Sequence, residues 1–177
     1  VWSDAIVGFM RIYLDNCCFN RPFDDQTHLR IRIEAEAKLF VQDLVREERL
    51  ELVWSYVLDY ENDANPFQDR REAVAEWKAL AVCDLDESSD VVELAERYGR
   101  IGMGARDALH VACAVVAGCH VFLTTDDGLL AKGTWDLGTV REKDDVLHEA
   151  RVNKQKTHVG SLMTICAEKF AEREEQF

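Results

Sequence analysis

The chain of 177 residues carries 34 acidic and 21 basic side chains, a formal net charge of −13, and 47% of its residues are hydrophobic. This length and this hydrophobic content predict one globular domain with a real core, and they argue against two compact domains. The negative charge counts against a broad, sequence-independent grip on nucleic acid through phosphate neutralisation, and it implies a basic partner or a bound cation.

The predicted elements alternate between strand and helix, which favours an α/β domain around a mostly parallel sheet. A short apolar run at 12–14 predicts the first strand, and we expect a polar loop over 16–25 after it. Apolar residues then recur every three or four positions, which predicts a helix over about 26–49. We expect its buried face to carry Leu29, Ile33, Ala37, Phe40 and Leu44, and its solvated faces to carry Glu34, Glu36, Lys38 and Arg46.

The next segment predicts a second strand at 50–55 and a turn into a helix that carries Glu61 near its start. Asn65-Pro66 interrupts that helix, because the residue before a proline is pushed away from helical geometry. A further helix is predicted over 68–79 and a short strand at 81–83. Residues 88–90 offer helix caps before an apolar face at 91–98.

Glycines at 99, 102 and 104 break the chain before a helix predicted over 105–117, and Gly118 ends that helix. Residues 120–125 predict the clearest strand of the sequence, and Asp126 stands where it stops. Beyond Gly133 the pattern fades, since 140–156 is charged and 160–170 fits either a strand or a helix. We expect one domain over 10–132, followed over 133–177 by a C-terminal segment that completes the sheet or forms an arm.

The six cysteines show neither CxxC spacing nor Cys/His pairs at zinc-finger distances, and most lie in apolar segments. We interpret them as reduced core residues and expect a cytoplasmic protein. No apolar run approaches the ~20 residues needed to span a bilayer, so we expect no membrane partner. Met10 directly precedes the first strand, which predicts that residues 1–9 are an N-terminal extension.

Acidic residues follow the predicted strands at the edge where open parallel sheets bind ligands. Asp15 and Asp126 come directly after the strands at 12–14 and 120–125. Asp107 lies in the first turn of the helix that leads into the second of these strands, so an antiparallel helix would bring it to the same edge. Glu61 reaches that edge from the second strand by the same logic. We therefore expect four carboxylates to converge, although no two are close in the sequence.

Carboxylates within several ångström of one another repel and titrate as a coupled set unless a cation lies among them. Magnesium and manganese prefer oxygen ligands and usually need only a few carboxylates together with substrate phosphate. Such a cation can activate water and stabilise a leaving oxygen. Phosphodiester hydrolysis is therefore the reaction class that this pattern favours.

The residues resemble the PIN-domain nucleases, and in particular the VapC-like toxins of bacterial and archaeal toxin–antitoxin pairs. The resemblance covers roughly residues 10–132. It rests on four motifs, namely Arg11-Ile-Tyr-Leu-Asp15-Asn16, Ser55 with Glu61 six residues later, Asp107-Ala-Leu-His110-Val-Ala112, and Leu123-Thr-Thr-Asp126-Asp127-Gly-Leu129. It implies a PIN-like α/β fold of three α/β/α layers, with a central, mostly parallel twisted sheet flanked by helices.

The resemblance also implies an endoribonuclease whose acidic quartet, Asp15, Glu61, Asp107 and Asp126, binds Mg²⁺ or Mn²⁺. RNA would be the substrate, the protein would form a homodimer, and a cognate antitoxin would inhibit it. Asp127 is the rival for the fourth place, but Thr124, Asp126 and Leu129 match the family's spacing. The family usually closes with a strand and a helix soon after the fourth acid, and neither can be assigned in 133–177.

Several residues near the quartet carry two interpretations. Asn16, Thr124 and Thr125 are expected to hydrogen-bond Asp15 or a water on the cation. Arg21 and Arg106 either hold RNA phosphates, which suit arginine's bidentate geometry, or form surface ion pairs. A structural role is favoured for His110 over a contact with substrate. Core roles are favoured for Cys17, Cys18, Trp54, Trp77 and Tyr98.

Other functional classes also place an aspartate at a strand end. A phosphotransferase of the haloacid-dehalogenase type needs a second aspartate two residues on, where this chain has Cys17. A phospho-aspartate receiver domain needs its acceptor on a middle strand and a lysine after a late one, and neither Glu61 nor Lys132 fits. A catalytically silent binding module that keeps the PIN scaffold stays open as the other alternative.

Overall fold

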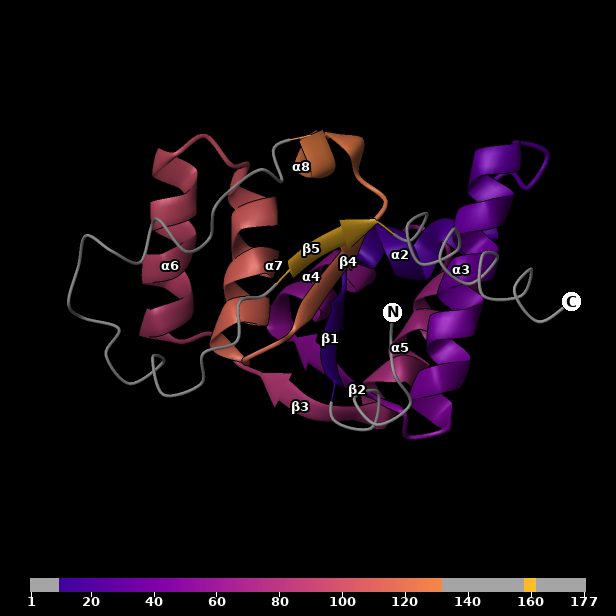
Figure 1. The fold of residues 1–177 in the computed structure, drawn as a ribbon, viewed down its shortest axis with the longest axis horizontal. Coiled ribbons are helices and arrows are strands. Elements are labelled where there is room, and N and C mark those ends of the chain that lie inside the picture. The colour runs from indigo at the N-terminus through magenta and orange to yellow at the C-terminus, as the bar shows by residue number, and fades with distance from the viewer. Residues whose placement is uncertain (1–9, 132–157, 162–177) are drawn as a thin grey trace, which may run out of the picture.

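The computed structural model describes residues 10–131 and 158–161, whose elements are drawn in Figure 1. Five parallel strands form one sheet in the order β3-β2-β1-β4-β5. They are β1 (Met10–Leu14), β2 (Leu50–Ser55), β3 (Ala81–Leu85), β4 (Val121–Thr124) and β5 (His158–Ser161). The predicted α/β class with a parallel central sheet is confirmed.

Helices connect the strands and lie on both sides of the sheet, with α6 and α7 on one side and α3 on the other (Figure 1). The longer ones are α3 (Leu29–Arg46), α6 (Ser89–Arg100) and α7 (Ala105–Val116). The shorter ones are α2 (Asn16–Asn20), α4 (Tyr56–Asp63), α5 (Gln68–Ala75) and α8 (Asp127–Ala131), with 3₁₀ turns η1 (Arg21–Phe23) and η2 (Glu76–Leu80). Within the described ranges, no helix combines the length and the apolar character that a membrane span requires.

The core lies where the central strands meet the helices. Tyr13 of β1 is fully buried and its ring stacks on that of Phe122 of β4, with 5.5 Å between the centroids. Trp54, Trp77 and Tyr98 are buried as the sequence predicts. Each large apolar side chain withdrawn from water in this way contributes roughly 1.5–3 kcal/mol to the stability of the fold.

The predicted polar loop over 16–25 is wrong, because this segment begins with the short helix α2 and the turn η1. Cys18 and Phe19 are fully buried, and the Phe19 ring lies 5.4 Å from that of Trp54. Pro22 lies in the first turn of η1, where its fixed φ favours a helical turn and its missing N–H costs nothing. Two apolar side chains in a polar stretch therefore anchor the segment to the core.

The buried face of α3 is one residue away from the face that the spacing predicts. Leu29 is 61% exposed, whereas Glu34 and Lys38, predicted to be solvated, are buried. The Glu34 carboxylate is compensated by ion pairs with Arg21 and Arg30, each at 2.8 Å. Lys38 lies over the rings of Phe19 and Trp77, and burial lowers its pKa to about 8. Both charges are tolerated in the core because Arg30 of the same helix and Arg21 from outside it pair with Glu34, and aromatic rings contact Lys38.

Other boundaries differ by less. The helix predicted over 68–79 divides into α5 and the 3₁₀ turn η2, and Glu61 lies near the end of α4 instead of its start. β5 pairs with β4 and extends the sheet beyond the domain predicted over 10–132. The predicted N-terminal extension at 1–9, most of the segment 133–177 and Cys166 lie outside the described residues.

The strand order creates a switch point between β1 and β4. The chain moves outward from β1 through β2 to β3 and then returns to the other side of β1 with β4. In open parallel sheets, the crevice at the carboxyl ends of two such strands is where ligands bind. Asp15 follows β1 and Asp126 lies just beyond β4, so both acids stand at this crevice.

Candidate active site

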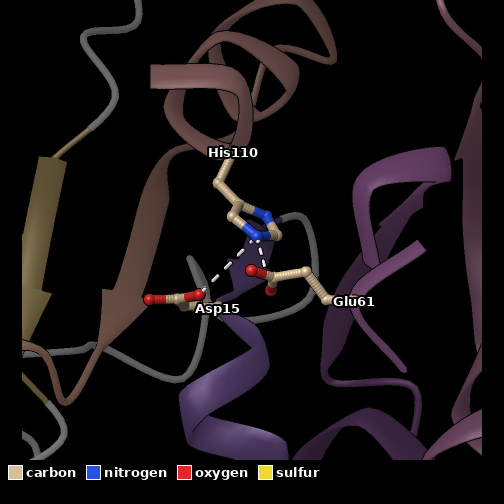
Figure 2. A group of neighbouring side chains, drawn as sticks. All are labelled: Asp15, Glu61 and His110. Atoms are coloured by element: carbon tan, nitrogen blue, oxygen red, sulfur yellow. Dashed lines mark hydrogen bonds and ion pairs between the residues drawn. The ribbon is translucent and has the colours of Figure 1, made fainter. Parts of the chain in front are cut away.

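Three side chains from three elements converge beside the carboxyl end of β1. Figure 2 shows Asp15, Glu61 of α4 and His110 of α7 pointing toward one another. One ligand atom from each, two carboxylate oxygens and a ring nitrogen, lie within 4.8 Å of one another. The Nε2 atom of His110 lies 2.9 Å from Glu61 Oε2 and 3.9 Å from Asp15 Oδ1. We call these residues the inner cluster.

Asp15 is held by the neighbouring strand and by its own helix. Its backbone N–H donates to the carbonyl of Leu123 at 2.9 Å, which fixes the start of the turn after β1. The hydroxyl of Thr124 donates to Asp15 Oδ2 at 2.7 Å, and the thiol of Cys17 donates to the same oxygen at 3.1 Å. Both donors engage Oδ2, while Oδ1 is the oxygen on the side of His110.

Glu61 is a half-buried carboxylate surrounded by donors. Burial pushes its pKa up, but the hydrogen bond and charge of His110, the charge of Arg106 and a hydrogen bond with Asn16 together hold the pKa of Glu61 below its ordinary value. Arg106 Nε lies 3.1 Å from Glu61 Oε1. Glu61 is therefore an ionised, acceptor-only group at neutral pH.

A buried chain of hydroxyl groups orients His110. Tyr13 Oη lies 2.8 Å from His110 Nδ1 and 2.6 Å from Ser55 Oγ. Because ionised Glu61 can only accept, His110 Nε2 must carry the proton that the two share. Burial raises the pKa of Tyr13 well above its usual value, so its phenol keeps the proton with which it can donate to Nδ1. The imidazole is thus fixed from both sides.

The other two predicted acids lie outside the inner cluster among the described residues, and we call Asp107 and Asp126 the outer pair. Asp107 is in the first turn of α7, where a Cβ added to Gly104 would lie 3.2 Å from its Oδ2. Asp126 Oδ1 accepts the backbone N–H groups of Gly128 at 2.6 Å and Leu129 at 3.2 Å, so it caps α8. The rival, Asp127, forms an ion pair with Arg30.

The remaining predicted residues lie around these acids. Thr124 bonds Asp15, whereas Asn16 bonds Glu61. Thr125 is buried, and its backbone N–H donates to Cys17 Sγ at 3.3 Å. Arg106 pairs with Glu61 and is 72% exposed, while Arg21 pairs with Glu34 and Asp24.

Sequence reasoning did not identify the roles of Tyr13 and Cys17, and for His110 it favoured a structural role over a contact with substrate. Alternation along a strand places Tyr13 on the same side as Asp15, and helical spacing places His110 one turn after Asp107. These spacings were visible in the sequence. Their meaning depends on Glu61, which reaches the site from another part of the chain.

The donor set of the inner cluster fits a hard divalent cation. Asp15 and Glu61 are half-buried, are brought close together, and offer the carboxylate oxygens that magnesium and manganese prefer. Thr124 and His110 fix their orientations, as residues surrounding metal ligands commonly do. Asp15 and Glu61 are the residues best placed to hold such an ion.

Comparison with family models identifies the family of the chain. Residues 12–133 match the family model described as PIN domain, and PIN domains are generally nucleases. Among solved structures, a chain from the crystal structure of VapBC2 from Rickettsia felis bound to a DNA fragment from their promoter is similar. It is 12% identical, with a TM-score of 0.44, over 70% of this chain and 92% of that chain. A search of curated proteins found no match.

Proposed function

We propose, since the chain belongs to the PIN domain family, that it is an endoribonuclease that depends on Mg²⁺ or Mn²⁺ and hydrolyses RNA phosphodiester bonds. The observation that carries this proposal is the approach of Asp15, Glu61 and His110 to within 4.8 Å at the switch point of the sheet. Two ionised carboxylates at that distance repel each other, and a divalent cation turns the repulsion into attraction.

The residues of the inner cluster and their neighbours have two proposed roles, binding the cation and orienting its ligands. Asp15 and Glu61 hold the cation, with Thr124 and His110 keeping the carboxylates in place. A bound divalent cation would supply activated water and a positive charge for the leaving oxygen. Arg106, largely exposed and attached to Glu61, can bond a phosphate oxygen of the strand without leaving the site.

Asp107 and Asp126 complete the proposed quartet from its periphery. Asp126 uses Oδ1 as a helix cap, so only its second oxygen is available to a cation or to a water on it. Asp107 stands in the first turn of α7, one turn before His110. We assign both a weaker part in catalysis than Asp15 and Glu61.

Cleavage assays on the full chain test this proposal. Wild type is expected to cut single-stranded RNA with Mn²⁺ or Mg²⁺ and to lose activity in EDTA. Asp15→Asn should remove cleavage while leaving the circular-dichroism spectrum unchanged. Asp43→Asn, a matched change at an exposed acid of α3, should remain active. Full activity of Asp15→Asn would remove Asp15 from the site.

The alternative classes predict different products. A receiver domain would form a stable acyl phosphate when incubated with a small phosphodonor, and it would leave RNA intact. A silent binding module would show neither reaction but would still bind a partner. Metal-dependent RNA cleavage with no acyl phosphate contradicts both alternatives.

We also propose that the protein is the toxin of a toxin–antitoxin pair and forms a homodimer, on the strength of the four motifs that resemble VapC-like toxins. The net charge of −13 favours a basic antitoxin. Co-expression with the product of a neighbouring reading frame should suppress cleavage, and sedimentation should report a dimer. An active monomer that no neighbouring product inhibits would contradict this assignment.

A further inference from the structure

An open pocket of about 410 Å³ lies beside the inner cluster, and Glu61 is part of its wall. Side chains from α2, α4, α5 and the segment between the last two also line it. Its volume falls in the ~300–1,000 Å³ range of sites that hold small organic groups. A ligand in this pocket would therefore touch one of the proposed cation-binding carboxylates.

Exposed aromatic side chains gather at this pocket. Tyr60 is 73% exposed and Phe67 is 56% exposed, and both line it. Phe23, the third large exposed aromatic among the described residues, lies under the guanidinium of Arg70, which also lies 4.6 Å from the ring centre of Phe67. Aromatic surface of this kind is usually buried, so its concentration at one pocket points to a partner that stacks on it.

The pocket wall carries more cationic than anionic side chains, although the chain as a whole is acidic. The sequence has a net charge of −13, yet the wall carries Arg70 and Arg106 against the one carboxylate of Glu61. Arg70 also lies 4.0 Å from the carboxylate of Asp24, which is not part of the wall. Arg106 is 72% exposed and Arg70 is 28% exposed, so both can be reached from solvent. Aromatic rings beside guanidinium groups suit a ligand that combines a flat ring with negative charge.

A chain of asparagine amides connects the far wall of the pocket to Glu61. Asn65 Nδ2 donates to Asn20 Oδ1 at 3.0 Å, and Asn20 Nδ2 donates to Asn16 Oδ1 at 3.1 Å. Asn16 in turn is hydrogen-bonded with Glu61. The amide dipoles therefore point toward the carboxylate and fix the pocket relative to the inner cluster.

We propose that this pocket is a subsite for one unpaired nucleotide of a single-stranded RNA, adjacent to the phosphodiester that is cut. The base stacks on Tyr60 or Phe67, and Arg70 and Arg106 meet the phosphates. Bases inside a duplex are stacked on their neighbours and present no free face, so the pocket selects single strands. The proposal rests on the proposed ribonuclease function, because the subsite would hold the RNA of that reaction beside the inner cluster.

Measuring RNA binding at equilibrium in a variant that cannot cleave RNA tests the pocket separately from the cleavage reaction. The full chain carrying Asp15→Asn is titrated into a fluorescent single-stranded oligoribonucleotide with Mg²⁺ present, and anisotropy is measured. Adding Tyr60→Ala or Phe67→Ala should weaken binding by about 5- to 150-fold, the factor measured for the loss of one stacked base. Tyr60→Phe keeps the ring and should bind normally. Leu39→Ala, an exposed apolar truncation on α3, is the matched control and should also bind normally.

A duplex of the same sequence should compete poorly with the single strand. Unchanged RNA binding by both alanine variants overturns the subsite, even where wild type cleaves RNA. If the alanine variants bind RNA more weakly but the wild-type chain never cleaves RNA, the subsite is supported and the ribonuclease function is contradicted. If the same variants lose inhibition by an antitoxin but keep their RNA affinity, the pocket belongs to a protein partner and the RNA subsite is overturned.

Discussion

The inner cluster and Asp126 of the outer pair stand at the same edge of the sheet but are held in different ways. Asp15 and Glu61 are oriented by side chains from β4 and α7, elements that lie far from them in the sequence. Asp126 is oriented by the backbone of the turn that it begins. The hydrogen bonds to Asp15 and Glu61 connect distant elements and fix both carboxylates at the switch point of the sheet, whereas the carboxylate of Asp126 already serves as a helix cap.

The largest difference is expected in catalysis. Asp15→Asn removes a charge from the proposed cation site and should lower kcat by on the order of 10³, or roughly 4 kcal/mol of transition-state stabilisation. Asp126→Asn keeps an oxygen that can cap α8 and should lower kcat by only about tenfold. Single-turnover cleavage of RNA in Mn²⁺ measures both. Equal losses in the two variants would erase the distinction between the inner cluster and the outer pair.

The next effect concerns His110, which orients Glu61. His110→Leu removes the donor at Nε2 and should lower kcat/KM by about 10- to 100-fold, as the loss of groups that position metal ligands commonly does. Tyr13→Phe removes only the hydroxyl that meets Nδ1 and should cost less. Cleavage assays with circular dichroism separate lost positioning from lost fold. Wild-type cleavage rates in His110→Leu would show that Glu61 does not need His110 to orient it.

Stability should show the opposite ranking. Asp126→Ala removes the cap of α8 and should lower the free energy of unfolding by about 1 kcal/mol. Asp15→Asn relieves the repulsion between Asp15 and Glu61 in metal-free protein and should leave stability unchanged or raise it. Urea unfolding in EDTA reports both values. A stabilised Asp126→Ala variant would contradict its role as a cap.

The smallest effect is a pH dependence. The pKa of Glu61 lies below its ordinary value, so its ionised form contributes stability above the unfolded pKa, and that contribution is lost as pH falls through the folded pKa. Arg106→Gln removes one of the charges that lower this pKa. The variant should therefore be less stable than wild type near neutrality, and the difference should vanish in acid. A difference that grows toward acid pH would reverse the sign expected for Glu61.

Much of the scaffold follows from the sequence, because strands and helices of this fold have distinct periods. The strand ending before Asp15 and the helix carrying Asp107 were predicted to within a few residues. The buried face of α3 was predicted one residue away, since Glu34 and Lys38 enter the core only because arginines and aromatic rings meet them there. Arg30 is a local partner one helical turn before Glu34, but Arg21 and the aromatic rings come from outside α3, where the helical pattern does not report them.

In the candidate site, too, local features could be predicted from the sequence and contacts between distant residues could not. Local sequence alone predicted that Asp15 and Asp126 lie at the carboxyl ends of two strands. The link between His110 and Glu61 joins positions 49 residues apart, and the chain through Tyr13 and Ser55 spans two strands. Such contacts exist only in the folded chain, which is why spacing favoured a merely structural histidine.

Asp15 and Glu61 are proposed to share a divalent cation. Anomalous diffraction from a crystal soaked in Mn²⁺ tests this claim most directly. Manganese gives a strong anomalous signal, whereas the carbon, nitrogen and oxygen atoms of these side chains give almost none and the sulfur of Cys17 gives a weak one. We expect one peak, or two close together, between the carboxylates of Asp15 and Glu61. A well-ordered site without a peak there, or with manganese bound only at Asp126 and Asp127, would contradict the account.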